Sequence, residues 1–253
     1  MMEYEFSRAE RLLGERAIRR LKDSHVMVFG IGGVGSHCIE ALARGGVGRL
    51  TLIDSDRVSI SNINRQSIAF HSTIGRYKTR VMRERLLDIN PELQVRVSEE
   101  FVLPENAADF FEERPDFVID AIDTVSAKLA LAKLAERRGI PIISCMGTGN
   151  KLDPSAFEIA DIYETSVCPL CRVMRRELRR RGVERLTVLY SREKPMTPGA
   201  GNGASAEAGE TDESAGRPVP GSVSFVPPAA GLRLAGYVLM QLLEGEGNGN
   251  EIL

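Results

Sequence analysis

The sequence has no tryptophan and only three histidines and four cysteines among its 253 residues. The cysteines are too few and too unevenly spaced for the disulfide framework of a secreted protein. They are Cys38, Cys145, Cys168 and Cys171. The first 20 residues are charged rather than apolar, which argues against a signal peptide. We therefore expect a cytoplasmic protein.

Long hydrophobic runs are also lacking. The most apolar stretch, PPAAGLRLAGYVLMQLLEG at residues 227–245, is shorter than the roughly 20 residues that cross a bilayer, and it contains Arg233. We expect a packed core helix there and no membrane association. The net charge is only −2, so any affinity for nucleic acid must come from local clusters of basic residues.

Short apolar segments alternate with amphipathic stretches along the chain. The apolar segments occupy residues 25–30, 50–54, 93–98, 117–123 and 140–145. Strands that are apolar at consecutive positions and separated by helices predict a parallel sheet covered on both faces. The pattern therefore predicts a doubly wound, mostly parallel, Rossmann-like α/β fold, with one domain over residues 1–253.

A polar segment rich in glycine and proline interrupts this pattern at residues 193–221. It offers too little apolar surface to offset its chain entropy, so we predict a flexible loop within the domain. Regular structure is expected to resume with a strand at SVSFVP, residues 222–227, followed by a C-terminal helix.

Four glycines, Gly30, Gly32, Gly33 and Gly35, stand between an apolar strand and the helix that follows it. Backbone N–H groups in such a turn can approach phosphate, and a helix N-terminus favours negative charge. Asp54 ends the next strand, where a carboxylate can bind ribose hydroxyls. These residues predict a nucleotide site, but by themselves they suit NAD as well as ATP.

A polar segment directly after Asp54 favours ATP. Its candidate ligands are Ser61, Asn62, Asn64, Arg65 and Gln66. A dehydrogenase needs no cation at this place. A nucleoside triphosphate does, because Arg65 can neutralise its β- and γ-phosphates through paired hydrogen bonds.

Two further residues fit a triphosphate site. Lys78 supplies a second cation, and Asp123 follows the fourth strand, where its carboxylate could hold a Mg²⁺ ion that bridges phosphate oxygens. Each residue also has an ordinary structural interpretation: a surface salt bridge for Lys78, a helix N-cap for Asp123 and a loop ion pair for Arg65. Their combination favours the nucleotide site.

The segments GIGGVG, LID, SNINRQ and DAID, together with Lys78, resemble the ubiquitin-activating-type adenylyltransferase superfamily, which includes thiamine- and molybdopterin-pathway enzymes. This resemblance covers most of residues 6–150. Within the superfamily, residues 143–182 and 220–232 resemble the tRNA threonylcarbamoyladenosine dehydratases, which extends the match over nearly the whole chain.

The resemblance implies that Gly33, Asp54, residues 61–65, Lys78 and Asp123 contact ATP. Asp54 would bind the ribose, Arg65 and Lys78 the phosphates, and Asp123 the Mg²⁺ ion. The segment EFSRAERLLG resembles one whose arginine reaches the partner's ATP site in a homodimer. Arg8 is the first candidate for that role, with Arg11 close by, and a plain helix-surface arginine is the alternative.

The resemblance further implies that ATP adenylylates the carboxylate of threonylcarbamoyladenosine in tRNA, after which the carbamoyl group closes a ring. Two other functions remain open: activation of the C-terminus of a ubiquitin-like sulfur carrier, and a non-catalytic nucleotide sensor. Sulfur-transfer partners, and a monovalent cation near the GTGN loop, also remain possible.

The motif CPLC, with Cys168 and Cys171, has the spacing of half a zinc site. A structural zinc ion needs four ligands, and no second motif of this kind follows. The histidines His25, His37 and His71 all belong to the N-terminal half. We therefore do not expect zinc, and the pair could be a redox dithiol or simply two thiols.

Arginines recur at helical spacing after this motif. They are Arg172, Arg175, Arg176, Arg179 and Arg180. The spacing predicts one cationic stripe on a helix that ends near Gly182. The stripe could bind RNA phosphates, or it could be a solvated helix face paired with Glu177 and Glu184.

Overall fold

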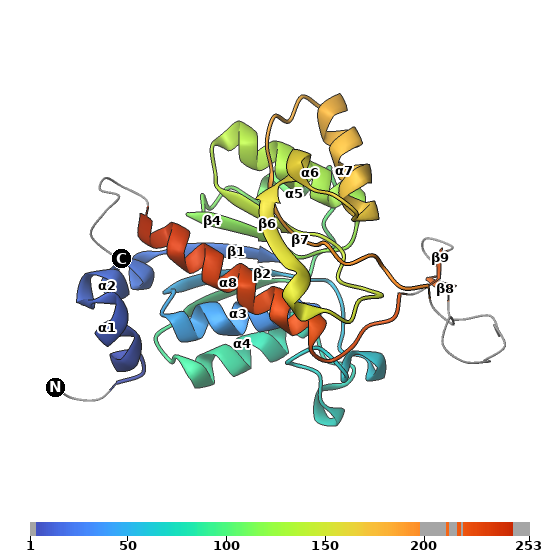
Figure 1. The fold of residues 1–253 in the computed structure, drawn as a ribbon. Coiled ribbons are helices and arrows are strands. Elements are labelled where there is room, and N and C mark those ends of the chain that lie inside the picture. The colour runs from blue at the N-terminus through green and yellow to red at the C-terminus, as the bar shows by residue number, and fades with distance from the viewer. Residues whose placement is uncertain (1–3, 198–210, 213–216, 219, 245–253) are drawn as a thin grey trace.

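The computed structural model describes residues 4–197, 211–212, 217–218 and 220–244. Its centre is a seven-stranded sheet in the order β3-β2-β1-β4-β5-β7-β6 (Figure 1). The strands are β1 (His25–Phe29), β2 (Arg49–Ile53), β3 (Gln94–Ser98), β4 (Phe117–Asp120), β5 (Ile142–Cys145), β6 (Phe157–Asp161) and β7 (Thr187–Ser191). All neighbours are parallel except β6, which pairs antiparallel with β7. The predicted doubly wound, mostly parallel sheet is confirmed.

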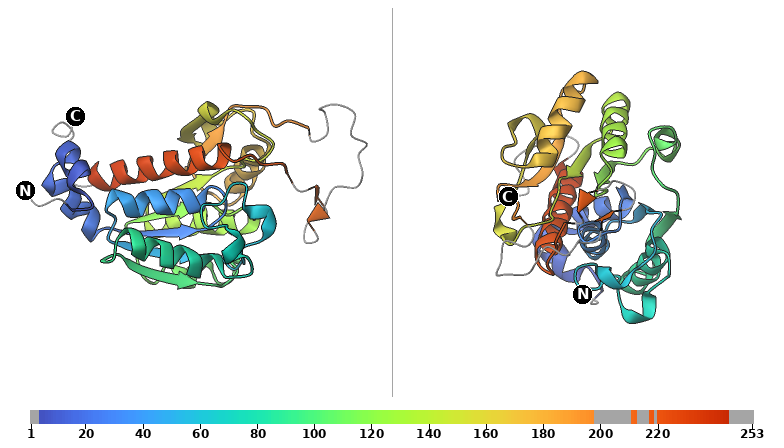
Figure 2. Two further views of the ribbon diagram at one scale, coloured as in Figure 1. Left: turned by 90° about the horizontal axis from the view of Figure 1, so that it is seen from below. Right: turned by 90° about the vertical axis from the view of Figure 1, so that its right-hand side faces the viewer.

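Helices cover both faces of the sheet, which explains why the inner strands are apolar at consecutive positions (Figure 2). The helices are α1 (Ser7–Leu13), α2 (Glu15–Asp23), α3 (Gly35–Gly45), α4 (Lys78–Ile89), α5 (Ala107–Phe110), α6 (Val125–Arg138), α7 (Pro169–Arg180) and α8 (Val226–Glu244). Val26 and Val28 of β1 belong to a core shared with α3, α4 and α8. Met27 and Phe29 belong to a second core shared with α5 and α6.

Helix α8 is the core helix that the apolar stretch predicts. Ala230, Leu234 and Val238 are buried at a spacing of four residues and form one face of the helix. This face packs closely on α3: a Cβ atom on Gly231 would lie 2.4 Å from the carbonyl oxygen of Val34. None of the helices in the described part of the chain is both long and apolar enough to cross a membrane.

The prediction of a strand at residues 222–227 is wrong. Residues 222–225 form no strand, and α8 begins at Val226. The outer edge of β7 is already paired with β6, and the backbone of this segment bonds elsewhere: Asn64 Nδ2 donates to the carbonyl oxygen of Ser222 at 2.9 Å. Neither β6 nor β7 is predicted from the sequence pattern.

The predicted loop at 193–221 is described only in part. Its described residues include two strands of two residues each, β8 (Thr211–Asp212) and β9 (Arg217–Pro218), which pair with each other. Residues 198–210, 213–216 and 219 lie outside the described part. The flexible loop and the single domain over 1–253 therefore stay predictions.

The glycine turn gives the first testable prediction. A Cβ atom on Gly35 would lie 1.9 Å from the carbonyl oxygen of Gly30, whereas a Cβ on Gly32 would meet nothing within 4 Å. Gly35→Ala should therefore lower the free energy of unfolding by about 1–3 kcal/mol or more, and Gly32→Ala should leave it nearly unchanged. Urea unfolding of both variants checks this. Equal midpoints for the two variants would contradict the close contact.

Candidate nucleotide-binding site

The glycine turn joins the carboxyl end of β1 to the amino end of α3. Gly30 has a φ of +93°, and a Cβ atom there would lie 2.7 Å from the carbonyl oxygen of Ala121, just after β4. Only glycine allows both this conformation and this approach. Gly32 borders open space, so the turn can bring backbone N–H groups and a helix N-terminus close to a phosphate.

Asp54 follows β2 and is tied to this turn. Its Oδ2 accepts a hydrogen bond from the N–H of Ile31 at 2.6 Å, and its Oδ1 accepts one from the N–H of Asp56 at 2.8 Å. Burial raises the pKa of Asp54, while the Lys78 ammonium and the two backbone donors act in the opposite direction. The predicted ribose ligand therefore lies beside the predicted phosphate turn.

Lys78 is the first residue of α4, and its ammonium lies between two carboxylates. Its Nζ is 2.7 Å from Asp56 Oδ2 and 4.0 Å from Asp54 Oδ2. The Lys78 side chain is only 7% exposed, so a surface salt bridge does not describe it. The cation is held at the same edge of the sheet as Asp54, the predicted ribose ligand.

Arg65 lies against the glycine turn. A Cβ atom on Gly33 would be 3.2 Å from Arg65 Cγ, and His37 Nε2 is 3.1 Å from the Arg65 carbonyl oxygen. Its Nη1 donates to the carbonyl oxygen of Ser61 at 2.8 Å and to Asn64 Oδ1 at 2.9 Å. Burial lowers the pKa of the guanidinium. The described contacts use Nη1 alone, so the guanidinium can still donate to phosphate.

The remaining polar residues of this segment shape its backbone. Asn62 Oδ1 accepts from the N–H of Ser59 at 3.1 Å, which fixes the turn that carries Arg65. Gln66 is buried, and its Oε1 has no hydrogen-bond partner among the described residues. Such a buried acceptor needs a partner from outside the described residues, for which an ordered water is sufficient.

Asp123 is exposed and follows β4, the strand beside β1. Thr124, rather than Asp123, is the N-cap of α6, so the helix-cap interpretation of Asp123 is wrong. The described residues contain no group of three or more potential metal ligands. Mg²⁺ at nucleotide sites is commonly held by one or two carboxylates together with phosphate oxygens and water, so a single exposed carboxylate at this edge fits such an ion.

A buried charged cluster lies just behind this edge, and the sequence analysis missed it. Lys128 Nζ is 3.1 Å from each oxygen of Asp120 and donates to the Cys145 carbonyl oxygen at 2.7 Å. Ser144 Oγ also donates to Asp120 Oδ2, at 2.5 Å. Asp120 Oδ1 in turn accepts from the N–H of Ile122 at 3.2 Å. The cluster therefore fixes the ends of β4 and β5, including the backbone that leads to Asp123.

Arg8 lies away from the glycine turn of its own chain. It is exposed on α1, and the neighbouring Phe6 ring packs beside Gly46, just after α3. The glycine turn is at the other end of α3, a helix of 11 residues that spans about 16 Å at ~1.5 Å per residue. The structure therefore does not bring Arg8 to the nucleotide residues of the same chain.

The predicted arginine stripe lies on α7, and its members have different surroundings. Arg172, Arg176, Arg179 and Arg180 are exposed. Arg175 is partly buried and donates to the carbonyl oxygen of Thr165 at 2.8 Å. Glu177 contacts Arg176, Arg180 and also Arg181, and these arginines lower the pKa of its carboxyl. Two arginines of the stripe, Arg176 and Arg180, thus belong to an ion-pair network, whereas the described residues include no ion pair for Arg172 or Arg179.

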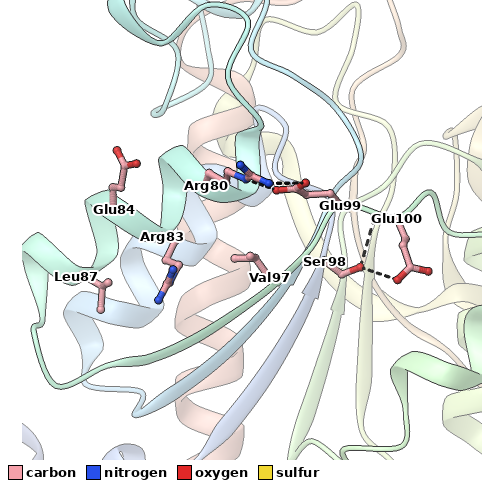
Figure 3. A pocket seen from close by; sticks show the side chains of 8 residues that line it. All are labelled: Arg80, Arg83, Glu84, Leu87, Val97, Ser98, Glu99 and Glu100. Atoms are coloured by element: carbon pink, nitrogen blue, oxygen red, sulfur yellow. Dashed lines mark hydrogen bonds and ion pairs between the residues drawn. The ribbon is translucent and has the colours of Figure 1, made fainter.

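A groove of 720 Å³ lies between α4 and the outer strand β3 (Figure 3). Arg80 pairs with Glu99 across it, and Arg83 and Glu84 line the same side as Arg80, since all three belong to α4. It contains none of the predicted nucleotide residues. Their site is the edge formed by the carboxyl ends of β1, β2 and β4, where ligands of open α/β sheets bind.

Comparison with known proteins agrees with this geometry. The ThiF family model matches residues 6–240, and the chain belongs to the ThiF family. A tRNA threonylcarbamoyladenosine dehydratase of Bacillus subtilis is 42% identical over 244 residues, 96% of each chain. One of Haemophilus influenzae is 44% identical over 178 residues, 70% of this chain and 68% of that one.

A solved structure shows that the similarity includes the fold. The crystal structure of the Escherichia coli tRNA N6-threonylcarbamoyladenosine dehydratase in complex with ATP matches with a TM-score of 0.83 and 34% identity. The match covers 94% of this chain and 93% of that one. The same E. coli enzyme is also solved with AMP, at a TM-score of 0.83.

The buried cluster gives the second prediction. Lys128→Met should leave the Asp120 carboxylate buried without a counter-charge and lower the free energy of unfolding by about 3–5 kcal/mol. Adding Asp120→Asn removes that charge, so the double variant should recover much of the loss. Urea unfolding of the wild type, the single and the double variant tests the pair. A double variant that is less stable than Lys128→Met would contradict this explanation.

Proposed function

We propose that this chain is an ATP-dependent tRNA threonylcarbamoyladenosine dehydratase. The observation that supports this most directly is that Asp54 and Arg65 contact the glycine turn, and Lys78 lies beside Asp54 at the same edge of the sheet. The fold around this edge is shared along most of its length with a dehydratase solved with ATP. A ribose ligand next to two cations suits a nucleoside triphosphate better than a dinucleotide.

Each residue at this edge has a role in the proposed site. The glycine turn and the α3 N-terminus bind phosphate, and Asp54 binds the ribose hydroxyls. Arg65 and Lys78 neutralise the phosphates from two sides. Asp123 would hold Mg²⁺, which when bound supplies positive charge at phosphate oxygens. None of these groups has to reorganise strongly, because Asp54, Arg65 and Lys78 are already fixed by the contacts described above.

The reaction proceeds in two steps. A carboxylate oxygen of threonylcarbamoyladenosine attacks the α-phosphorus of ATP and displaces pyrophosphate, which gives an acyl-adenylate. The neighbouring carbamoyl group then attacks the acyl carbon, closes the ring and releases AMP, which carries away the carboxylate oxygen. The ring closure is intramolecular, so it gains from proximity and needs no enzyme nucleophile.

We infer a homodimer in which Arg8 acts in the partner's site. Arg8 lies at the far end of α3 from its own glycine turn, so a contact with a nucleotide would have to be made in the partner's site; a plain helix-surface arginine is the alternative. Arg11 is exposed on the same short helix and is the alternative residue for this contact.

The arginines of α7 are the proposed contact with tRNA. Arg172 and Arg179 are exposed, and the described residues include no carboxylate paired with either one. Arg179 lies over the ring of Tyr163, with 5.0 Å between the guanidinium carbon and the ring centroid. These two arginines are therefore better placed to meet phosphates than Arg175, which is held by Thr165.

The decisive assay combines the purified protein, ATP and Mg²⁺ with tRNA that carries threonylcarbamoyladenosine, or with the unmodified tRNA as a control. We expect the modified nucleoside to lose the mass of one water, with AMP formed only on the modified tRNA. AMP formation that depends on a ubiquitin-like protein, with no change in the nucleoside, would instead favour sulfur-carrier activation. ATP binding without AMP formation would favour a nucleotide sensor.

The third prediction concerns Arg65. Arg65→Ala removes a charged hydrogen-bond partner of phosphate and should weaken the interaction by about 1.5–3 kcal/mol, with a larger loss in rate if the contact tightens in the transition state. Arg83→Ala, an exposed arginine on α4, serves as the control. Calorimetric ATP binding and the rate of AMP formation are the measurements. Unchanged values for Arg65→Ala would remove it from the mechanism.

The fourth prediction concerns the stripe. Arg172→Gln with Arg179→Gln should weaken tRNA binding and flatten the log–log salt dependence by about 0.7–0.9 per lost phosphate contact. ATP affinity should hardly change, because Debye screening over about 8 Å limits long-range effects. The control is Arg19→Gln with Arg83→Gln, two exposed arginines on other helices. If both double variants give the parent's salt slope, the stripe is a solvated helix face.

A further inference from the structure

The proposed reaction leaves the thiols of Cys168 and Cys171 without a role. Cys168 is the N-cap of α7, and Cys171 lies in the first turn of this helix, three residues later. Side chains at this spacing lie about 5–6 Å apart at Cβ, which a small adjustment brings within the range of a disulfide. Both thiols are reduced in the structure, and the Cys171 thiol is near enough to act on the pKa of Cys168 as a hydrogen-bond donor.

The chain enters α7 through a strained turn. Val167 has a φ of +63°, a conformation that β-branched residues rarely adopt, and the N–H of Cys168 donates to the carbonyl oxygen of Ser166 at 2.6 Å. Ser166 and Val167 are exposed, while Cys168 is 3% exposed and Cys171 is fully buried. Cys168 is thus the outer thiol, directly beneath a strained surface turn, and Cys171 is the inner one.

The charged groups around the pair are mostly positive. Lys151, itself buried, faces Cys168, and Arg175 faces Cys171. The backbone N–H groups of Leu170 and Cys171, at the positive end of α7, also face the Cys168 sulfur. Cys145 adds a third neutral thiol nearby, and Glu193 lies on the other side of Lys151.

These surroundings shift the pKa values of the two thiols in opposite directions. The hydrogen bond from Cys171 and the helix amides outweigh burial and lower the pKa of Cys168 to about 6, with Lys151 acting in the same direction. The pKa of Cys171 is raised, because its thiol donates that hydrogen bond and is desolvated. Of the two thiols, Cys168 is therefore the one that ionises more readily.

We propose that Cys168 and Cys171 form a redox-active dithiol, with Cys168 as the nucleophile and Cys171 as the resolving thiol, and that its co-reactant is a low-molecular-weight disulfide. The inference is independent of the tRNA reaction. It rests on the spacing at the start of α7, the outer and inner positions of the thiols and the cations that face them. The described residues offer no set of three or more metal ligands that would engage the pair instead.

The exchange has two steps. The Cys168 thiolate attacks one sulfur of the disulfide R–S–S–R, forming a mixed disulfide and releasing R–S⁻. The Cys171 thiol gives up its proton to the released thiolate or to water and attacks Cys168 Sγ, which releases the second R–S⁻. The two cysteines are oxidised by two electrons, and the co-reactant is reduced to two thiols.

Glutathione disulfide is the probe for the test. The full-length protein is incubated with it, free thiols are alkylated, and the modified peptides are mapped by mass spectrometry. We expect a Cys168–Cys171 disulfide in the wild type, a glutathione adduct on Cys168 in Cys171→Ser, and at least tenfold slower modification in Cys168→Ser. Cys38→Ala, which removes a buried thiol elsewhere, is the control and should react as the wild type does.

The pH dependence of adduct formation in Cys171→Ser is the second measurement. It should titrate below the value of about 8.5 for an unperturbed thiol, because the hydroxyl introduced by Cys171→Ser can still donate a hydrogen bond and the helix amides and Lys151 remain. Lys151→Met, which removes the facing cation, should shift the midpoint upward. An unperturbed midpoint, adducts mainly on Cys38 or Cys145, or no reaction of the folded wild-type protein would overturn the proposal.

Discussion

The backbone contact between Gly30 and Gly35 is the constraint on which the rest of the site depends. Because neither residue has a Cβ atom, α3 can start directly over the end of β1, with its N-terminus facing the carboxyl edge of the sheet. The same glycines allow β4 to approach, since the backbone of Ala121 lies where a Cβ on Gly30 would be. Asp54 follows β2 and Asp123 follows β4, so both lie at the edge where these strands end. Arg65, in the segment after Asp54, packs against the glycine turn at the same edge.

Local patterns predicted much of this arrangement, and non-local pairing accounts for what they missed. The residues of β1 are apolar without alternation because the strand is buried on two faces, so it could be recognised from the sequence. The strands β6 and β7 pair across an intervening helix, which no local pattern reveals. Residues 222–225 look like a strand, but their backbone bonds to side chains such as Asn64, and β6 occupies the edge.

The same distinction between local patterns and non-local contacts applies to the residues of the candidate site. The shared location of the glycines, Asp54, Arg65 and Lys78 could be predicted, because each residue type suits a nucleotide ligand at a fixed place relative to a strand. Lys128 and Asp120 could not, because an ion pair becomes a buried cluster only when α6 packs on β4. The charged groups thus fall into three sets: a buried pair that fixes the strand ends, the cations Arg65 and Lys78 at the edge proposed to bind the nucleotide, and exposed arginines on α7.

Oxygen labelling can show whether this edge activates a carboxylate on tRNA as an adenylate. The substrate is tRNA whose threonylcarbamoyl carboxylate carries ¹⁸O in both oxygens, and both products are analysed by mass. The mechanism predicts one ¹⁸O in each AMP and loss of one ¹⁸O from the nucleoside. Unlabelled AMP formed alongside the cyclic nucleoside, or label found in inorganic phosphate with ADP as the nucleotide product, would contradict it.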